Sequence, residues 1–260
     1  MTTPESLANQ LFEAWQTNTP MDMSTLEGAL TDFDTAYHVQ DAFAAKKAEP
    51  TAGYKISLTS KATQDLFKTN EPLYGAQIAS HILSAPATID LAQMNEPLIE
   101  VELAMTAKED LVPGLSDEEL LARVTVAGDM EVPDARFKAW FPKLDKYLVV
   151  ADCAVGGYIV CGEPVDGATL SVKDLEGIHV ELTLNGQPVR SGNSTEVLGN
   201  PINALQWLIQ KLAQHGKTLK KGTTVSTGTF FVPPKLEAGL YEATFTGTLA
   251  QTVRLTVKGR

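Results

Sequence analysis

The segment IHVELTLNGQPV, residues 178–189, decides the fold class of this chain. Apolar and polar side chains alternate along IHVELTL, which is the pattern of a strand with one buried face. Asn185 and Gly186 then end the alternation, and this dipeptide is typical of a two-residue type I′ turn, in which both residues need a positive φ. The segment therefore predicts a β-hairpin.

Similar short runs continue on both sides of this hairpin. They are rich in β-branched residues and are bounded by Pro, Gly and Asn, which are typical of turns. The runs are YKISLT at 54–59, PLIEVELAM at 97–105, ADCAVGGYIVCG at 151–162, GTTVSTG at 222–228 and YEATFTGTLAQTVRLTV at 241–257. We therefore expect a mostly β body from residue 51 to residue 260.

Helices are expected mainly before this body. Residues 5–18 place apolar side chains on one helical face, Ser24 and Glu27 have the form of a capping box, and a further helix is predicted over residues 35–48. Two helices should interrupt the strands, at 116–124 and at 201–214. The prediction is an α+β protein with a helical N-terminal segment, residues 1–50, on a β-rich catalytic body, residues 51–260.

Composition narrows the class of protein. The 260 residues carry a net charge of −11, so the chain as a whole does not attract nucleic-acid phosphates or an anionic membrane. No apolar run approaches the roughly 20 residues of a membrane span, and the N-terminus does not resemble a signal peptide. Cys153 and Cys161, on one predicted strand, lie too far apart to form a disulfide. These features predict a cytoplasmic protein that binds neither nucleic acid nor membrane.

Two carboxylates interrupt the apolar strand PLIEVELAM. Glu100 and Glu102 are two residues apart, so their side chains point to the same face. A solvent-facing strand would explain this pair, but Glu131 in GDMEVPDAR is a third carboxylate with apolar neighbours. Three carboxylates with water would suit a hard divalent cation such as Mg²⁺ or Mn²⁺. The sequence therefore offers a metal site.

Lys55 is unusual in the same way, because it lies in the apolar strand start AGYKISLTS. It is either a lysine whose ammonium reaches solvent or a buried proton-transfer group. Burial and a neighbouring cation would both lower the pKa of Lys55. We predict the second case, with a pKa lowered by burial and a bound cation, although the three carboxylates act against this shift.

The order of motifs along the chain resembles the 2-oxopent-4-enoate hydratase and 4-oxalocrotonate decarboxylase family of the fumarylacetoacetate hydrolase superfamily. The matching segments are GYKISLTSKA at 53–62, EPLYGA at 71–76, EPLIEVELAM at 96–105, MEVPDAR at 130–136, VADCAVGGYIVCG at 150–162, SGNSTEVLGNPINALQWLIQKLAQHG at 191–216 and VSTGTFFVP at 225–233. The resemblance runs from about residue 5 to the C-terminus and implies the rolled β-sheet body of that superfamily.

The resemblance also implies roles for individual residues. It makes the three glutamates the ligands of Mg²⁺ or Mn²⁺ and Lys55 the active-site lysine. It gives Asp152 a supporting catalytic or orienting role. It places Ser226, Thr227 and Gly228 in a turn that lines the substrate pocket, although an ordinary β-turn would have the same composition.

The activity that the resemblance implies is hydration of a 2-hydroxy-2,4-dienoate to a 4-hydroxy-2-oxo acid, in the catabolism of aromatic compounds. Decarboxylation of a 4-oxalocrotonate-type 2-oxo acid is the alternative, because Leu73 stands where hydratases often have aspartate and decarboxylases an aliphatic residue. A third possibility is a catalytically silent protein that binds a 2-oxo acid. A homo-oligomer is expected, with a pathway enzyme as a further partner.

Overall fold

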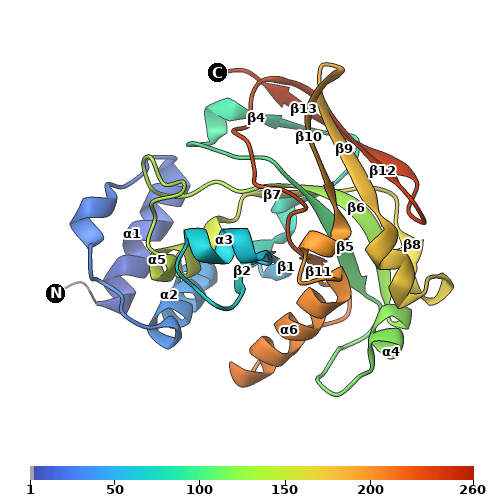
Figure 1. Ribbon diagram of the computed structural model, residues 1–260. Coiled ribbons are helices and arrows are strands. Elements are labelled where there is room, and N and C mark those ends of the chain that lie inside the picture. Colours follow the sequence, from blue (N-terminus) through green and yellow to red (C-terminus); the bar gives the residue numbers. More distant parts are fainter. Residues whose placement is uncertain (1–2) are drawn as a thin grey trace.

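The computed structural model describes residues 3–260 and confirms the α+β class. An N-terminal helical layer lies beside two β-sheets (Figure 1). The helices are α1 (Pro4–Thr17), α2 (Phe33–Lys46), α3 (Lys61–Leu66), α4 (Asp117–Ala122), α5 (Lys146–Ala151) and α6 (Pro201–Gln214). Among the described residues, no helix is both long and apolar enough to cross a bilayer.

The larger sheet has eight strands and carries the site described below. Its order is β2-β1-β11-β5-β6-β7-β3, and β8 pairs with β6. The bounds are β1 (Thr51–Ser57), β2 (Leu73–Ile78), β3 (Ile82–Ser84), β5 (Glu100–Ala107), β6 (Val124–Val132), β7 (Tyr158–Cys161), β8 (Val165–Asp166) and β11 (Thr224–Ser226). The strands β1 and β5 are separated by about 45 residues in sequence but lie on either side of β11, which brings Lys55 and the glutamates of β5 together.

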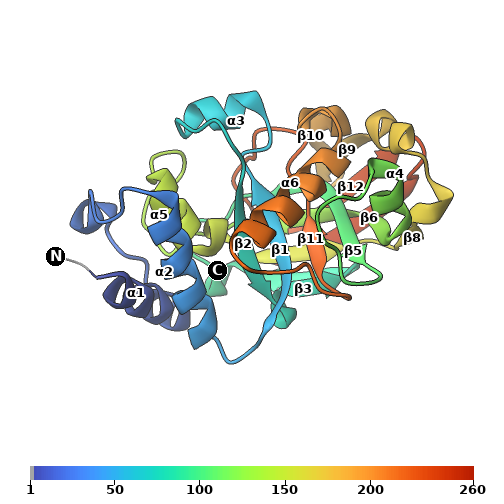
Figure 2. The same ribbon diagram turned by 90° about the horizontal axis from the view of Figure 1, so that it is seen from below.

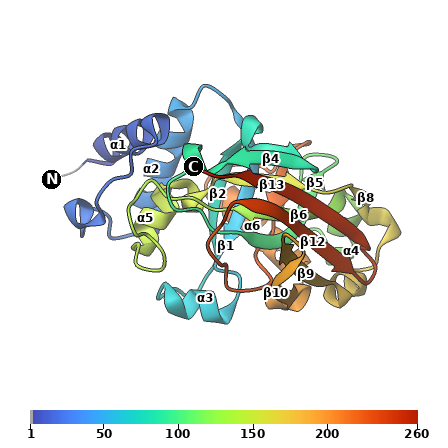
Figure 3. The same cartoon turned by 90° about the horizontal axis from the view of Figure 1, so that it is seen from above.

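A five-stranded sheet packs against the larger one. Its order is β10-β9-β12-β13-β4, with bounds β4 (Ala87–Asp90), β9 (His179–Leu184), β10 (Gln187–Asn193), β12 (Gly239–Thr246) and β13 (Gln251–Lys258). Figure 3 shows β12 and β13 lying over β6. The two layers approach closely at Gly128, where an added Cβ would lie 2.4 Å from the Phe245 ring.

The predicted hairpin is confirmed. Asn185 and Gly186 join β9 to β10 with φ values of 51° and 76°, as a type I′ turn requires. The helices at 116–124 and 201–214 are also confirmed, as α4 and α6, and Ser116 forms its capping box with Glu119. Helix α6 lies beside β1 and β11 in Figure 2, and its C-terminal His215 contacts Tyr74 of β2.

The N-terminal helices are joined to the body by buried polar contacts. Gln40 of α2 donates to the carbonyl oxygens of Tyr74 and Val150 and accepts from the amide of Ala76. Helix α5, far along the sequence, packs on α2. The helical layer therefore includes residues beyond 50, and a boundary at that residue stays a prediction; residues 1–2 of the predicted segment lie outside the described residues.

Two local predictions were wrong. The segment Ser24–Glu27 is no capping box, because Asp22 caps a short 3₁₀ helix, Met23–Leu26, by accepting from the amide of Ser24. Residues 151–162 do not form one strand either. They contain the end of α5, a turn at Cys153–Val155 and β7, so the two cysteines lie in different elements and both are free thiols.

Candidate active site

A cavity lies between the large sheet and the helical layer. It is lined from the sheet by residues of β1 and β5, and from the other side by α3, α5 and the loops beside them. The lining residues are Lys55, Ile56, Ser57, Leu58, Thr63, Phe67, Leu98, Glu100, Glu102, Pro133, Trp140, Phe141, Val149, Val155, Thr229 and Pro233. Lys55 and two of the three predicted glutamates therefore line one cavity.

The three predicted glutamates converge on one point. Glu100 lies directly opposite Glu131 in the antiparallel pairing of β5 with β6, and Glu102 follows two residues later on the same face. One carboxylate oxygen from each lies within 4.8 Å of the others. Glu102 and Glu131 are almost fully buried, whereas the side chain of Glu100 is 13% exposed. The two-residue spacing of Glu100 and Glu102 therefore correctly predicted that their side chains lie on the same face.

Lys55 lies against these carboxylates with 1% of its surface exposed. Its Nζ is 2.6 Å from Oε2 of Glu131 and 3.5 Å from Oε2 of Glu100. Burial on its own lowers the pKa of Lys55, but the charges of Glu131, Glu100 and Glu102 together outweigh burial and raise it. The predicted lowering of the pKa assumes a cation bound beside Lys55 and stays a prediction; without a cation, the carboxylates raise the pKa of Lys55.

A fourth carboxylate, which the sequence analysis missed, belongs to the same cluster. Asp129 lies directly opposite Glu102 in the β5–β6 pairing and is completely buried. Burial raises the pKa of Asp129, and the negative charge of Glu100 raises it further. Its position two residues before Glu131 repeats the spacing of Glu100 and Glu102, so the same rule of strand alternation could have found it.

Ser226 connects two of these carboxylates. Its Oγ lies 2.6 Å from Oε2 of Glu102 and 2.7 Å from Oδ2 of Asp129. A serine hydroxyl has a single proton and cannot donate to two acceptors at once. One of the two carboxyl groups must therefore supply a proton, in agreement with the raised pKa values of Glu102 and Asp129, for which burial is the largest cause.

The cluster fits a divalent cation. Oε1 of Glu102 and Oε1 of Glu131 are buried and have no hydrogen-bond partner, and Oε2 of Glu131 has only the ion pair with Lys55, which is not aligned as a hydrogen bond. Buried polar atoms without partners are costly, so their presence indicates a missing ligand. Carboxylate oxygens are the donors that Mg²⁺ and Mn²⁺ prefer.

The turn at 226–228 holds Glu102 and does not line the cavity. The amide of Gly228 donates to Oε2 of Glu102 at 2.6 Å, and the hydroxyl of Thr227 donates to the carbonyl oxygen of Leu103. The side chains of Ser226 and Thr227 are completely buried. Thr229, one residue further along, is the one that lines the cavity. The contact of this turn with substrate stays a prediction, and in the structure the turn positions the carboxylate of Glu102.

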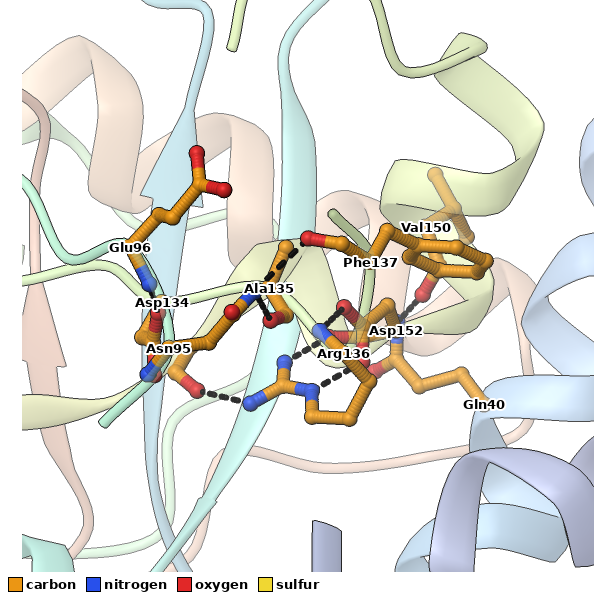
Figure 4. Close-up of polar contacts among 10 residues, drawn as sticks. Gln40, Asn95, Glu96, Asp134, Ala135, Arg136, Phe137, Val150 and Asp152 are labelled. Atoms are coloured by element: carbon orange, nitrogen blue, oxygen red, sulfur yellow. Dashed lines mark hydrogen bonds and ion pairs between the residues drawn. The ribbon is translucent and has the colours of Figure 1, made fainter. Parts of the chain in front are cut away.

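Asp152 lies outside the cavity lining, in an ion pair with Arg136 (Figure 4). Its Oδ1 accepts from Nε of Arg136, its Oδ2 accepts from the Arg136 amide, and its carbonyl oxygen accepts from Nη2 of Arg136. Arg136 also donates to the carbonyl oxygen of Gly156. The pair therefore fixes residues 152–156, a segment that brings Val155 to the cavity wall.

This segment has an unusual backbone. Cys153, Ala154 and Val155 have φ values of 53°, 51° and 53°, in the left-handed region that residues with a Cβ rarely adopt. Such a conformation persists only when its surroundings enforce it. The Arg136–Asp152 pair and the close packing of the Cys153 carbonyl on Gly75 supply that enforcement. Asp152 is thus placed to orient the cavity wall.

Comparison with known proteins gives a consistent set of relatives. A 2-keto-4-pentenoate hydratase of Paraburkholderia phymatum is 32% identical over 230 residues, 86% of each chain. A 2-hydroxyhexa-2,4-dienoate hydratase of Comamonas testosteroni is 31% identical over 232 residues, again 86% of each chain. No family model matches the chain.

Solved structures agree on the fold. The 4-oxalocrotonate decarboxylase of Pseudomonas putida G7, complexed with magnesium and adipate, superposes with a TM-score of 0.89, with 24% identity over 98% of this chain and 97% of that one. A yeast fumarylacetoacetate hydrolase family protein superposes with a TM-score of 0.61, with 15% identity over 86% of this chain and 96% of that one. The fold expected from the resemblance is confirmed.

Proposed function

Because this chain belongs to the 2-keto-4-pentenoate hydratase family, we propose that it is a hydro-lyase that adds water to a 2-hydroxy-2,4-dienoate of the 2-oxopent-4-enoate type. In this reaction the dienol first becomes a conjugated 2-oxo-3-enoate, as its hydroxyl proton is lost and C5 gains a proton. Water then adds its oxygen to C4 and a proton to C3. The product is a 4-hydroxy-2-oxo acid.

Glu100, Glu102 and Glu131 would hold Mg²⁺ or Mn²⁺ in this proposal. The support is the convergence of their oxygens and the lack of partners for the buried ones. A bound divalent cation would supply Lewis-acid chemistry, because it attracts electron density from a 2-oxo group while a proton moves. Asp129 and Ser226 would hold Glu102 in place through their hydrogen bonds.

Lys55 is our candidate for proton transfer. It lines the cavity, and its Nζ lies 2.6 Å from Oε2 of Glu131 and 3.5 Å from Oε2 of Glu100, contacts that favour the ammonium form before substrate binds. Lys55 would act first as an acid that delivers a proton to C5 and afterwards take a proton from the attacking water, while the proton that C3 gains balances the one that the dienol hydroxyl lost. Ser57 lies two residues further along the same face of β1 and also lines the cavity, so its hydroxyl would be a group to orient that water.

One observation carries the proposal: a buried lysine and three converging glutamates meet at one cavity. A catalytically silent relative would have no reason to keep these groups, since buried like charges are costly. Decarboxylation uses the same kind of electron withdrawal, so the two chemistries need a direct comparison. Incubation with 2-hydroxypenta-2,4-dienoate and separately with 4-oxalocrotonate, with products identified by mass, tests the choice. A gain of one water supports hydration, whereas loss of carbon dioxide alone would overturn it.

Four further features belong to the proposal. We propose that the protein is a homo-oligomer, that it lies in the cytoplasm, that it acts in the catabolism of aromatic compounds and that it has a surface for a pathway enzyme. Family membership is the support for all four. Light scattering on the eluting protein measures the subunit number, and a mass equal to one chain would contradict the first of these.

A further inference from the structure

A second cavity lies beside the cavity of the candidate active site. The two cavities share the side chains of Leu98, Trp140, Phe141 and Pro233, so they are neighbours across these four residues. The second cavity has a volume of about 510 Å³, which is in the range of small-molecule sites. Its charged lining residues are Glu96, Lys143, Lys235 and Arg260. Because three of these four carry a positive charge, we call it the basic cavity.

The two lysines are the free charges of the basic cavity. Lys143 and Lys235 are exposed, and neither forms an ion pair with a carboxylate of residues 3–260. Arg260, in contrast, donates to backbone carbonyl oxygens of residues 91–95, which hold its guanidinium against the chain. Oε1 of Glu96 accepts from a backbone amide. The ammonium groups of the lysines therefore remain available to an anion.

The rest of the molecule repels an anion. The chain has a net charge of −11, and the active site itself holds Glu100, Glu102, Glu131 and Asp129. Lys55 is already in ion pairs with Glu131 and Glu100. A divalent cation held by three glutamates has its charge offset by theirs, so it attracts little at a distance. An anionic 2-oxo acid thus approaches the site against a repulsive field unless nearby positive charge offsets that field.

We propose that the basic cavity is the entrance to the active site, where Lys143 and Lys235 attract the carboxylate of an incoming 2-oxo acid. This inference rests on the proposed function, because it takes the 2-oxo acid as the ligand of the neighbouring site. Charges at the rim of a site act on the association rate, whereas contacts in the final complex determine the dissociation rate. The two lysines are therefore steering residues and take no part in the chemical step.

Stopped-flow binding of 2-oxopentanoate to the Mg²⁺-loaded protein tests this inference without turnover. Trp140 lines both cavities, so its fluorescence is a suitable signal. Steering by the lysines predicts that the association rate falls about fivefold as NaCl rises from about 20 mM to about 500 mM, because salt screens the attraction. Repulsion by the net charge of the chain would instead make association faster as salt is added. An association rate that rises with salt, or does not change, would overturn the proposal.

Charge reversal locates the effect. The double variant Lys143→Glu/Lys235→Glu should associate about tenfold more slowly at low salt, while its dissociation rate stays within about twofold of the unsubstituted value. The variant Lys143→Arg/Lys235→Arg keeps both charges and should keep the association rate. An unchanged association rate in the glutamate variant would contradict the assignment of the basic cavity.

A matched control separates position from net charge. Lys173→Glu/Lys221→Glu changes the net charge of the chain by the same amount at two exposed lysines that do not line either cavity. Its association rate should stay within about twofold of the unsubstituted value. A loss equal to that of Lys143→Glu/Lys235→Glu would make net charge the cause and overturn the inference.

The outcomes also separate this inference from the proposed function. Charge-dependent association of 2-oxopentanoate in a protein that does not hydrate dienoates keeps the entrance and removes the hydratase assignment. Hydration of dienoates by a protein whose association rates ignore Lys143 and Lys235 keeps the hydratase assignment and removes the entrance.

Discussion

Nζ of Lys55 lies 2.6 Å from Oε2 of Glu131, and both side chains are 1% exposed. The cation and the anion come from strands that do not touch, since β11 and β5 lie between β1 and β6. The pair therefore exists because two long side chains on one face of the sheet reach toward each other across the two strands between them. It joins the proposed proton-transfer group to a proposed metal ligand, and each can be tested separately.

Replacing the lysine should separate chemistry from metal binding. Lys55→Met should retain Mg²⁺ binding and lose about 10²–10⁴-fold in kcat, because proton transfer by a positioned side chain is typically worth that much. Titration calorimetry with Mg²⁺ and steady-state kinetics measure the two properties. Lys68→Met is the control, since the Lys68 side chain is exposed and lines no part of the cavity. Near-normal turnover by Lys55→Met would remove the lysine from the mechanism.

Removing a glutamate should weaken metal binding more than it weakens the fold. Glu100→Ala removes one proposed ligand and also relieves repulsion, because the charge of Glu100 helps to raise the pKa values of Glu102 and Glu131. We expect metal affinity to fall at least about tenfold, as for loss of one of three ligands, while the melting temperature of the metal-free protein stays equal or rises. Thermal melts with and without Mg²⁺ measure both. Unchanged metal affinity would contradict the ligand assignment.

Asp152 should matter for stability rather than for proton transfer. Asp152→Ala leaves the buried Arg136 guanidinium without its carboxylate, and loss of one partner of a buried ion pair typically costs about 3–5 kcal/mol. Denaturant unfolding measures this loss. The rate per folded molecule should change far less than in Lys55→Met. A variant of normal stability that has lost turnover would instead make Asp152 a catalytic residue.

His81 should make stability depend on pH. Burial is the largest cause that lowers the pKa of His81, to about 4, with the charges of Lys47 and Arg136 acting in the same direction. The unfolded chain, with a histidine pKa near 6.5, then binds more protons than the native state between pH 6.5 and pH 4. Stability from this group is therefore full above pH 6.5 and falls as the pH drops through that window, by about 2–3 kcal/mol.

Unfolding free energies at pH 7, 5.5 and 4.5 test this prediction. His81→Phe, which can pack beside Trp15 and Tyr158, should reduce the loss between pH 7 and pH 4.5 relative to the unsubstituted protein. His38→Gln changes an exposed histidine of α2 and is the matched control. An identical pH dependence in His81→Phe would exclude this histidine as the source.

Elements with strong local signals could be predicted from the sequence. The hairpin at Asn185 and Gly186 and helix α6 each have their own turn or cap residues, which act within a few positions. Helix α5 could not be identified, because its sequence KYLVVA is nearly all apolar after the first residue and fits a buried strand equally well. The left-handed turn after it depends on Arg136 and Gly75, which are distant in sequence.

Part of the candidate site could likewise be predicted from the sequence, and part could not. Strand alternation indicates that Glu100 and Glu102 share a face, and the pairing of β5 with β6 adds Glu131 and Asp129. The function of Ser226 as a link between carboxylates depends on cross-strand register, which no local pattern specifies. The direction of the Lys55 pKa shift depends on distances to carboxylates, so it required the structure.

The most direct test of the central claim follows one reaction in one sample. Protein freed of metal by a chelator is mixed with 2-hydroxypenta-2,4-dienoate, the dienol absorbance is recorded, and Mg²⁺ is then added in excess of the chelator, with the product identified by NMR. Our account predicts little enzymatic conversion before the addition and rapid formation of 4-hydroxy-2-oxopentanoate after it. Equal rates before and after the addition, or no hydrated product at all, would contradict it.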